Sequence, residues 1–393
     1  MKRYDNIQIL RVLACLGVFV THLAQRMGIT GFWGRAANFG ASGVYLFFLI
    51  SAFLACGSAG CRPGAGRKGV TSYYIRRAFR ILPLYYAVIL YNFLLHTLLL
   101  HNTTPDPAGL GWLRYLFMTN AFFPAPDNFW GNLSGTWTIS LFVCFYLTAP
   151  LLVRAAGVKG AESRKNVGSR KDVKRGKDAE NRMDAKGTGS RVPGSFRISI
   201  GVVRAAVLYA ATLLLQQIWL RQSFSDYMMF FYYLHFFALG ILVWQLADCY
   251  RPVPAALRLC VILLPTGLLL YALSGGILYF TALSWIFALL LLLTLDFSWE
   301  RIRMHTENGA VLRAVRICEK GFGILDTHSF GIYLVHGVVI DGMIMLQGRM
   351  EFSAFAVFLI VTGATAAGAF LAHRLIELPG EKLGRFLAGR ISR

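Results

Sequence analysis

The sequence predicts an all-α integral membrane protein, a bundle of about ten transmembrane helices with both termini on the cytoplasmic side (N-in and C-in). The first observation is composition: 56% of the 393 residues are hydrophobic and only 15% are charged, against about 25% charged residues in ordinary soluble domains. The second is that apolar runs of about 18 to 20 residues, enough to cross a bilayer, recur along most of the chain. The third is the uneven distribution of Lys and Arg between these runs.

Ten apolar segments are expected as membrane spans. Because lipid offers no partner for a backbone amide, each should be a helix, whose hydrogen bonds are internal. The expected spans are residues 6–23, 42–56, 82–100, 137–153, 198–218, 228–246, 257–273, 278–296, 325–345 and 352–373.

The basic residues orient these spans, because the cytoplasmic loops of membrane proteins carry an excess of Lys and Arg. With both termini inside, 33 of the 40 Lys and Arg residues fall in inner segments and 5 in outer loops. Topology thus accounts for the net charge of +21. We expect no nucleic-acid partner, since the basic residues do not gather along one folded face. The expected surroundings are membrane lipids.

The chain, residues 1–393, is expected to form one membrane domain. Residues 159–191 are rich in charged residues, Gly and Ser and carry almost no large apolar side chain, which predicts a disordered basic cytoplasmic loop. Residues 101–136 form the longest expected outer loop, and four prolines interrupt helical structure there.

Arg11 and His22 lie within the first expected span, where a charged side chain costs about 2.5 to 3.5 kcal/mol. At about 100° per residue, the eleven-residue spacing puts both on one helical face, about 16 Å apart along the axis. That face should point into the bundle, with Arg11 toward the cytoplasm and His22 near the outer end. Two interpretations stay open from spacing alone: a functional pair, or a snorkelling arginine with a histidine at the interface.

Three arginines, Arg76, Arg77 and Arg80, stand at the inner mouth of the third expected span. Simple anchoring by positive charge explains them. The alternative is that their forked guanidinium groups bind phosphates, such as those of coenzyme A.

The ninth expected span carries Ser329, Tyr333 and His336 at spacings that stack them on one helical stripe. A structural hydrogen-bond network and a catalytic lining are both compatible with this stripe. Trp137 and Ser140 put polar groups at the start of the fourth span. Glu377, just past the tenth, is interpreted as a surface charge that could instead pair with an inner arginine.

The sequence shows no glycine-rich nucleotide loop, no cluster of metal ligands and no Gly-x-Ser-x-Gly motif. We therefore expect no metal and no prosthetic group. A histidine with basic partners suits general-base activation of a hydroxyl and stabilisation of a tetrahedral intermediate, which are the requirements of acyl transfer.

Five segments resemble, in order, the motifs of the acyltransferase-3 family of bacterial membrane O-acyltransferases. They are RVLACLGVFVTH (11–22), GVYLFFLISAFL (43–54), YYIRRAFRILPLYY (73–86), SFGIYLVH (329–336) and IELPGEKL (376–383). One departure concerns TWTISLFVCFYL (136–147), where Phe142 and Val143 stand in place of two acidic residues that many members carry.

The resemblance implies a transferase that moves an acyl group, usually acetyl, from cytosolic acyl-CoA to a hydroxyl of an envelope glycan, a lipid-linked sugar or a similar acceptor. It implies a multi-pass protein of the bacterial cytoplasmic membrane. His22 would be the base or relay, Arg11 its charge partner, and Arg76, Arg77 and Arg80 the donor-binding residues. The implied substrate-lining residues are Ser51, Trp137, Ser140, Ser329, Tyr333, His336 and Glu377.

A transporter is the main alternative function, because buried Arg and His residues also serve proton relays and substrate paths. A non-catalytic membrane scaffold is a third. The sequence shows no inverted repeat and no paired broken helices that would favour transport.

Overall fold

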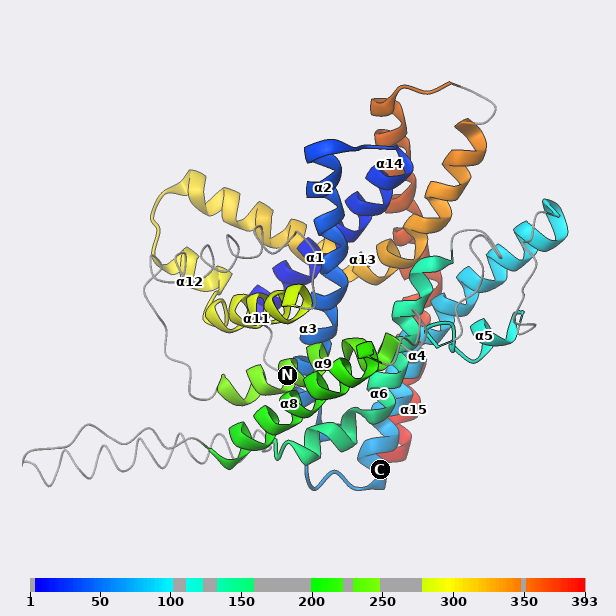
Figure 1. Cartoon of the computed structure of the whole chain (residues 1–393). Helices are drawn as coiled ribbons and strands as arrows, with labels where there is room; N and C mark the ends of the chain where they lie inside the picture. The colour runs from blue at the N-terminus through cyan, green and yellow to red at the C-terminus, as the bar shows by residue number, and fades with distance from the viewer. Residues whose placement is uncertain are drawn as a thin grey trace, which may run out of the picture.

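All regular elements in the described part of the chain, residues 4–101, 111–122, 133–158, 199–221, 229–247, 278–347 and 351–392 of a computed structural model, are helices. They are arranged as Figure 1 shows: α1 (Asp5–Arg26), α2 (Gly31–Phe39), α3 (Gly43–Gly57), α4 (Arg67–Phe93), α5 (Leu113–Leu116), α6 (Trp137–Ala155), α8 (Ile200–Arg221), α9 (Met229–Leu246), α11 (Leu278–Leu293), α12 (Trp299–Met304), α13 (Gly309–Gln347), α14 (Ala354–Ala372) and α15 (Leu378–Ser392). Tighter or wider helical turns join them: η1 (Gly40–Ser42), η2 (Ala59–Cys61), η3 (Leu94–Leu99), η4 (Ser134–Thr136) and η5 (His373–Glu377).

Seven stretches of the described residues are long and apolar enough to cross a membrane: Asp5–Arg26, Gly31–Gly57, Arg67–Leu98, Trp137–Ala155, Ile200–Ile218, Gly309–Gln347 and Ala354–Ile391. Two shorter apolar helices, Phe230–Leu246 and Thr281–Leu293, coincide with two more of the expected spans. The expected span 257–273 and the expected loop 159–191 lie outside the described residues. The chain is a multi-pass membrane protein.

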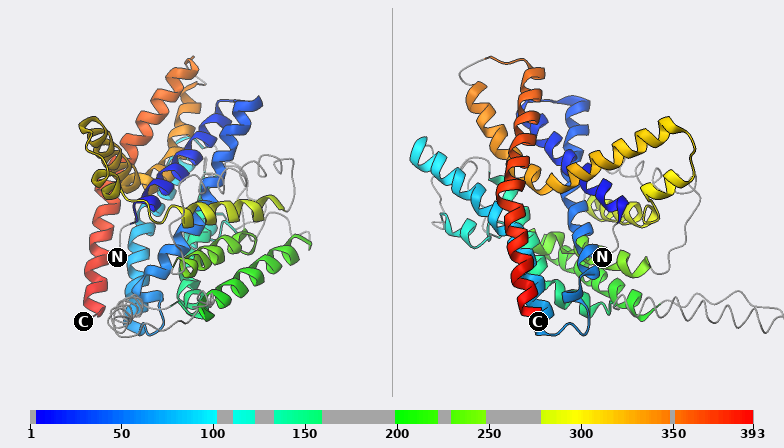
Figure 2. Two further views of the ribbon diagram at one scale, coloured as in Figure 1. Left: turned by 90° about the vertical axis from the view of Figure 1, so that its left-hand side faces the viewer. Right: turned by 180° about the vertical axis from the view of Figure 1, so that it is seen from behind.

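The structure corrects the ends of several expected spans. α4 begins at Arg67 rather than at residue 82, so the three arginines lie on the helix itself. α13 begins at Gly309 rather than at residue 325, and α14 continues through η5 into α15. These extensions are more polar than a lipid-facing segment needs to be. Two of them support each other, since the first half of α4 lies along α15 (Figure 2).

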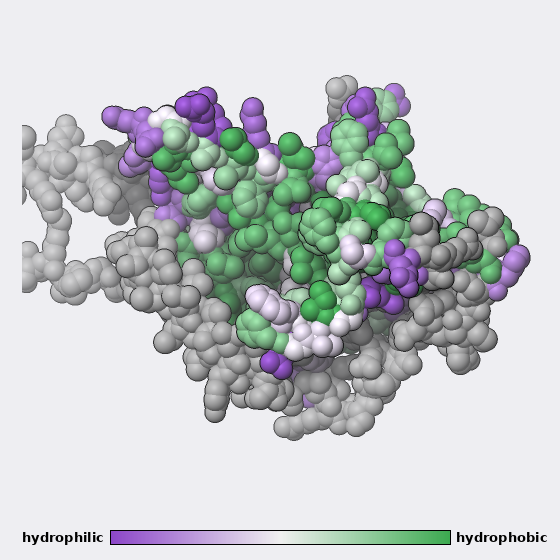
Figure 3. All heavy atoms as spheres, turned by 90° about the horizontal axis from the view of Figure 1, so that it is seen from above, coloured by the Kyte–Doolittle hydropathy of each residue, from purple (hydrophilic) through white to green (hydrophobic). Residues whose placement is uncertain are grey.

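Apolar side chains cover much of the outer surface. Leu151 is 68% exposed, Val207 63% and Phe355 71%. In the view from above, apolar side chains gather over the middle of the face and hydrophilic ones stand toward its edges (Figure 3). Exposed apolar area on this scale is typical of a surface that faces lipid.

Helix α3 lies at the centre of the packing, with the side chains of Phe48 and Phe53 fully buried. It is in extensive contact with α1 and α9. The contact with α9 is close at Gly240, where an added Cβ would overlap the carbonyl oxygen of Leu49 and lie 2.9 Å from the Cβ of Ala52. This approach fixes the position of α3, which contributes Ser51 to the site described below.

We expect Gly240→Ala to lower the free energy of unfolding by about 1 to 3 kcal/mol, because the new methyl group forces α3 and α9 apart. The matched control is Gly363→Ala in α14, where an added Cβ meets no atom within 4 Å. That change should be neutral or stabilising by about 0.5 to 1 kcal/mol, because alanine favours a helix. Thermal unfolding of the purified protein in detergent measures both, and equal shifts in Tm would contradict this packing.

Candidate active site

Helix α1 turns the face that carries Arg11 toward α13. Arg11 Nη1 lies 3.3 Å from Asp326 Oδ1, and each of the two side chains is only 20% exposed. The other side of α1 presents Leu13, Leu16 and Val20, which are between 37% and 53% exposed. A charge inside an apolar span needs a partner of opposite sign, and here the partner is a carboxylate on α13.

A cavity of about 110 Å³ opens beside this ion pair. One part of its wall is basic, formed by Arg11, Arg77 and Arg80. Its other wall residues with polar groups are Ser51 from α3, Tyr146 from α6, and Ser329 and Tyr333 from α13. The rest is mainly aromatic and aliphatic. Such a mixture of apolar surface with a few convergent polar groups is typical of ligand sites.

Arg77 is held against this cavity by two aromatic rings. Its guanidinium carbon lies 4.6 Å from the ring centroid of Tyr146 on α6 and 5.6 Å from that of Tyr73, one turn earlier on α4. Cation–π contacts of this kind stabilise a desolvated arginine by about 2 kcal/mol. Phe142, one of the two residues at which the sequence departs from the motif that it resembles, also lines the cavity and stacks on Tyr146.

A second, smaller cavity of about 20 Å³ lies beside His22, which is room for about one water molecule. His336 lines it too, and the two imidazole rings have centroids 5.3 Å apart. His336 Nδ1 lies 3.0 Å from the carbonyl oxygen of Ile332. That contact favours the tautomer with its proton on Nδ1, which leaves Nε2 as an acceptor.

Tyr333 lines both cavities. Its hydroxyl lies 2.7 Å from Thr138 Oγ1 and donates to the carbonyl oxygen of Gly135 at 3.4 Å. Arg11 and His22 therefore share one face of α1 but line two different cavities. The two cavities meet at Tyr333. The inward-facing stripe predicted from the sequence is present, and a cavity lies beside each of its two polar residues.

The segment before α6 supports the second cavity. Ser140 donates a hydrogen bond to Asn120 Oδ1, and Asn120 Nδ2 donates to Thr136 Oγ1 at 2.8 Å. Trp137 packs its ring against Tyr233, with centroids 5.5 Å apart. Ser140 and Trp137 thus stand behind the cavity walls rather than in them.

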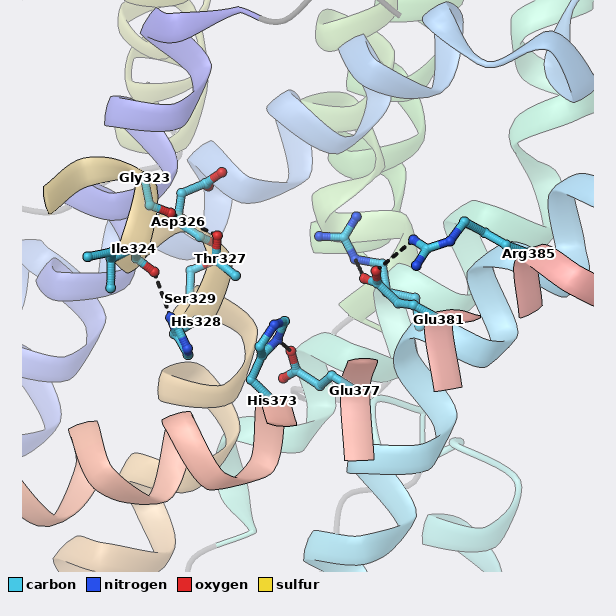
Figure 4. Close-up of polar contacts among 11 residues, drawn as sticks. Gly323, Ile324, Asp326, Thr327, His328, Ser329, His373, Glu377, Glu381 and Arg385 are labelled. Atoms are coloured by element: carbon cyan, nitrogen blue, oxygen red, sulfur yellow. Dashed lines mark hydrogen bonds and ion pairs between the residues drawn. The ribbon is translucent and has the colours of Figure 1, made fainter. Parts of the chain in front are cut away.

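Two other predicted site residues lie away from both cavities. Arg76 is exposed on the surface of α4. Glu377 is 5% exposed, so its interpretation as a surface charge is wrong. Its Oε2 lies 2.9 Å from His373 Nδ1 within η5 (Figure 4). Burial of this carboxylate follows from the continuation of α14 into α15, which keeps η5 inside the packed structure.

Sequence reasoning missed three residues that the structure brings to the site: Asp326, Asn120 and Glu381. A signal for Asp326 was present, because it precedes Ser329 by three residues and so belongs to the same helical stripe. Asn120 lies in the expected outer loop, and no periodic pattern marks it. Within the described part of the chain, no group of three or more His, Cys, Asp or Glu residues is placed to hold a metal ion.

Comparison with known proteins gives one family and two curated relatives. The profile of a family described as an acyltransferase domain matches residues 4–374. Acyltransferase MdmB of Streptomyces mycarofaciens is 29% identical over 162 residues, which are 39% of this chain and 40% of that protein. Nodulation protein 10 of Rhizobium leguminosarum bv. viciae is 26% identical over 171 residues, 38% of this chain and 44% of that protein. The matches thus span less than half the length of either relative. No solved structure matches.

The partly buried ion pair of Arg11 with Asp326 provides a test of the packing around the site. We expect Arg11→Gln to lower the free energy of unfolding by about 3 kcal/mol, because it leaves Asp326 as a carboxylate without its guanidinium partner. Arg385→Gln is the matched control: Arg385 Nη1 lies 3.2 Å from Glu381 Oε2, and the two side chains are 58% and 29% exposed. There the loss should stay within about 1 kcal/mol. Chemical unfolding in mixed micelles measures both, and comparable losses would show that Arg11 is solvated.

Proposed function

The chain belongs to the acyltransferase-3 family, and we propose that it transfers an acyl group, most simply acetyl, from cytosolic acyl-CoA to a hydroxyl group of an envelope glycan, a lipid-linked sugar or a similar acceptor. The observation that carries the proposal is the pair of cavities that meet at Tyr333, one lined by arginines and the other by histidines. The arginines suit an anionic donor, and the histidines suit the hydroxyl group of an acceptor.

The larger cavity is the proposed donor side. Arg11, Arg77 and Arg80 supply positive charge there, and guanidinium groups bind phosphate oxygens with two parallel hydrogen bonds. The apolar part of the wall suits the acyl chain and the thioester. Of the three arginines on α4 expected to bind the donor, Arg77 and Arg80 line the cavity, and Arg76 would act from the surface.

The smaller cavity is the proposed acceptor side, with His22 as the general base. The acceptor oxygen bonds to the thioester carbonyl carbon while the hydroxyl proton passes to His22. The carbon–sulfur bond then breaks, and the coenzyme A thiolate takes the proton back. The Tyr333 hydroxyl, which donates to the carbonyl oxygen of Gly135 in this structure, would turn its one O–H to the oxyanion instead. Such a donor typically lowers a barrier by about 3 kcal/mol. His336, beside His22, would help to orient it.

The proposed membrane arrangement is ten spans with both termini in the cytoplasm of a bacterial cell. Its support is the distribution of Lys and Arg and the helices that coincide with all the expected spans that fall within the described residues. Arg11 then lies toward the cytosolic donor and His22 toward the outer face. The name of one relative, Acyltransferase MdmB, denotes the same class of reaction. Neither the cavities nor the relatives favour the alternative function, a transporter.

We expect His22→Gln to lower the rate of acetyl transfer by at least about 100-fold, because glutamine cannot take the acceptor proton. The assay incubates membranes with labelled acetyl-CoA and follows label on glycans and lipids, together with a mass gain of about 42 Da, that of an acetyl group. His305→Gln, which changes an exposed histidine after α12, should leave the rate unchanged. Solute flux without acyl transfer by the wild-type protein would instead support a transporter.

A further inference from the structure

Helix α15 is docked on α4 by small residues at every fourth position. An added Cβ on Gly380 would lie 2.7 Å from the carbonyl oxygen of Phe79, and one on Gly384 would lie 2.6 Å from the Cβ of Phe79. One turn further, the hydroxyl of Ser72 donates to the carbonyl oxygen of Ala388 at 2.9 Å. The glycines let the two helices approach closely, so α15 is held in one register along α4.

This register places Glu381 between two arginines. Its Oε1 lies 3.8 Å from Arg80 Nε on α4, and its Oε2 accepts a hydrogen bond of 3.2 Å from Arg385 Nη1 on α15. Figure 4 shows the carboxylate of Glu381 with a guanidinium on either side. Arg80 lines the larger cavity, so this trio extends the basic wall of the cavity outward onto α15.

The two guanidinium groups retain unused donors. The Arg80–Glu381 distance of 3.8 Å is too long for a hydrogen bond. Within the described residues, Arg80 donates no hydrogen bond and its side chain is 43% exposed. Arg385 is 58% exposed and uses one of its five N–H groups on Glu381. Two guanidinium groups that approach one carboxylate can also approach one phosphate group, because a phosphate presents the same kind of oxygen acceptors.

We propose that Arg385 and Arg80 together bind a phosphate group of the acyl donor at the mouth of the larger cavity, with Glu381 as the residue that positions both. The proposal rests on the proposed function for the identity of the donor. The wall of the cavity is mainly apolar, and burying phosphates against apolar surface is costly. The thioester arm therefore lies deepest in the cavity, and a phosphate at the nucleotide end of the donor stays at the mouth, beside Arg80 and Arg385.

The test compares two donors that share the thioester and differ in phosphate. Acetyl-CoA carries phosphates and S-acetylpantetheine carries none. For the full chain in phosphatidylcholine nanodiscs, we expect Arg385→Gln to raise KM for acetyl-CoA about tenfold, the effect of losing one charge-assisted hydrogen bond. The kinetics with S-acetylpantetheine should change less than about twofold. Arg390→Gln is the control, since Arg390 lies on the same helix but stacks on Phe386.

Equal effects of Arg385→Gln on both donors, or no effect on either, would overturn the proposal. An equal rise in KM would assign Arg385 to lipid headgroup phosphates or to helix packing. Titration calorimetry with coenzyme A and with pantetheine keeps the test independent of catalysis. Suppose that the Kd for coenzyme A rises about tenfold in Arg385→Gln but the wild-type protein transfers no acyl group. The phosphate site would then stand, and the proposed function would be refuted.

Discussion

The arrangement of the site depends on the cost of placing the charge of Arg11 inside an apolar helix. Lipid cannot solvate a guanidinium, so α1 must turn this residue toward a protein partner. The partner is Asp326 of α13, at 3.3 Å. Once this pair forms, the rotation of α1 about its axis is fixed, and His22, on the same face, turns toward α13 as well. A single, partly buried ion pair thus places both cavities between α1 and α13.

Helix α13 supplies the complementary face to both cavities. Asp326, Ser329, Tyr333 and His336 follow one another at intervals of three or four residues, so they form one stripe along the helix. Their order along the stripe sets the order of the site: the ion pair, then the larger cavity, then Tyr333 as the boundary, then the histidines. The distance between the two cavities is thereby set by helix geometry rather than by loops, which makes it rigid.

The sequence predicted what depends on composition and on position along one helix. Apolar length identified the spans, and helical spacing placed Arg11 and His22 on one inward face. It did not predict which acid Arg11 meets or that Glu377 is buried, because both depend on which helices pack together. The close approach of α15 to α4 likewise depends on glycines whose packing role appears only when two helices meet. Motif resemblance supplied the candidate residues, and tertiary packing decided that Arg77 and Arg80 line a cavity whereas Arg76 does not.

Phe142 and Val143, where the sequence departs from the family motif that it resembles, contribute no charge to the site. Among the described residues that line the larger cavity, three are arginines and none is acidic. Asp326 and Glu381 lie beside two of these arginines, whereas Arg77 lies against the rings of two tyrosines. The wall therefore keeps a net positive charge. An apolar ring at residue 142 adds no negative charge to it, so the electrostatics of this cavity favour an anionic ligand over a cationic one.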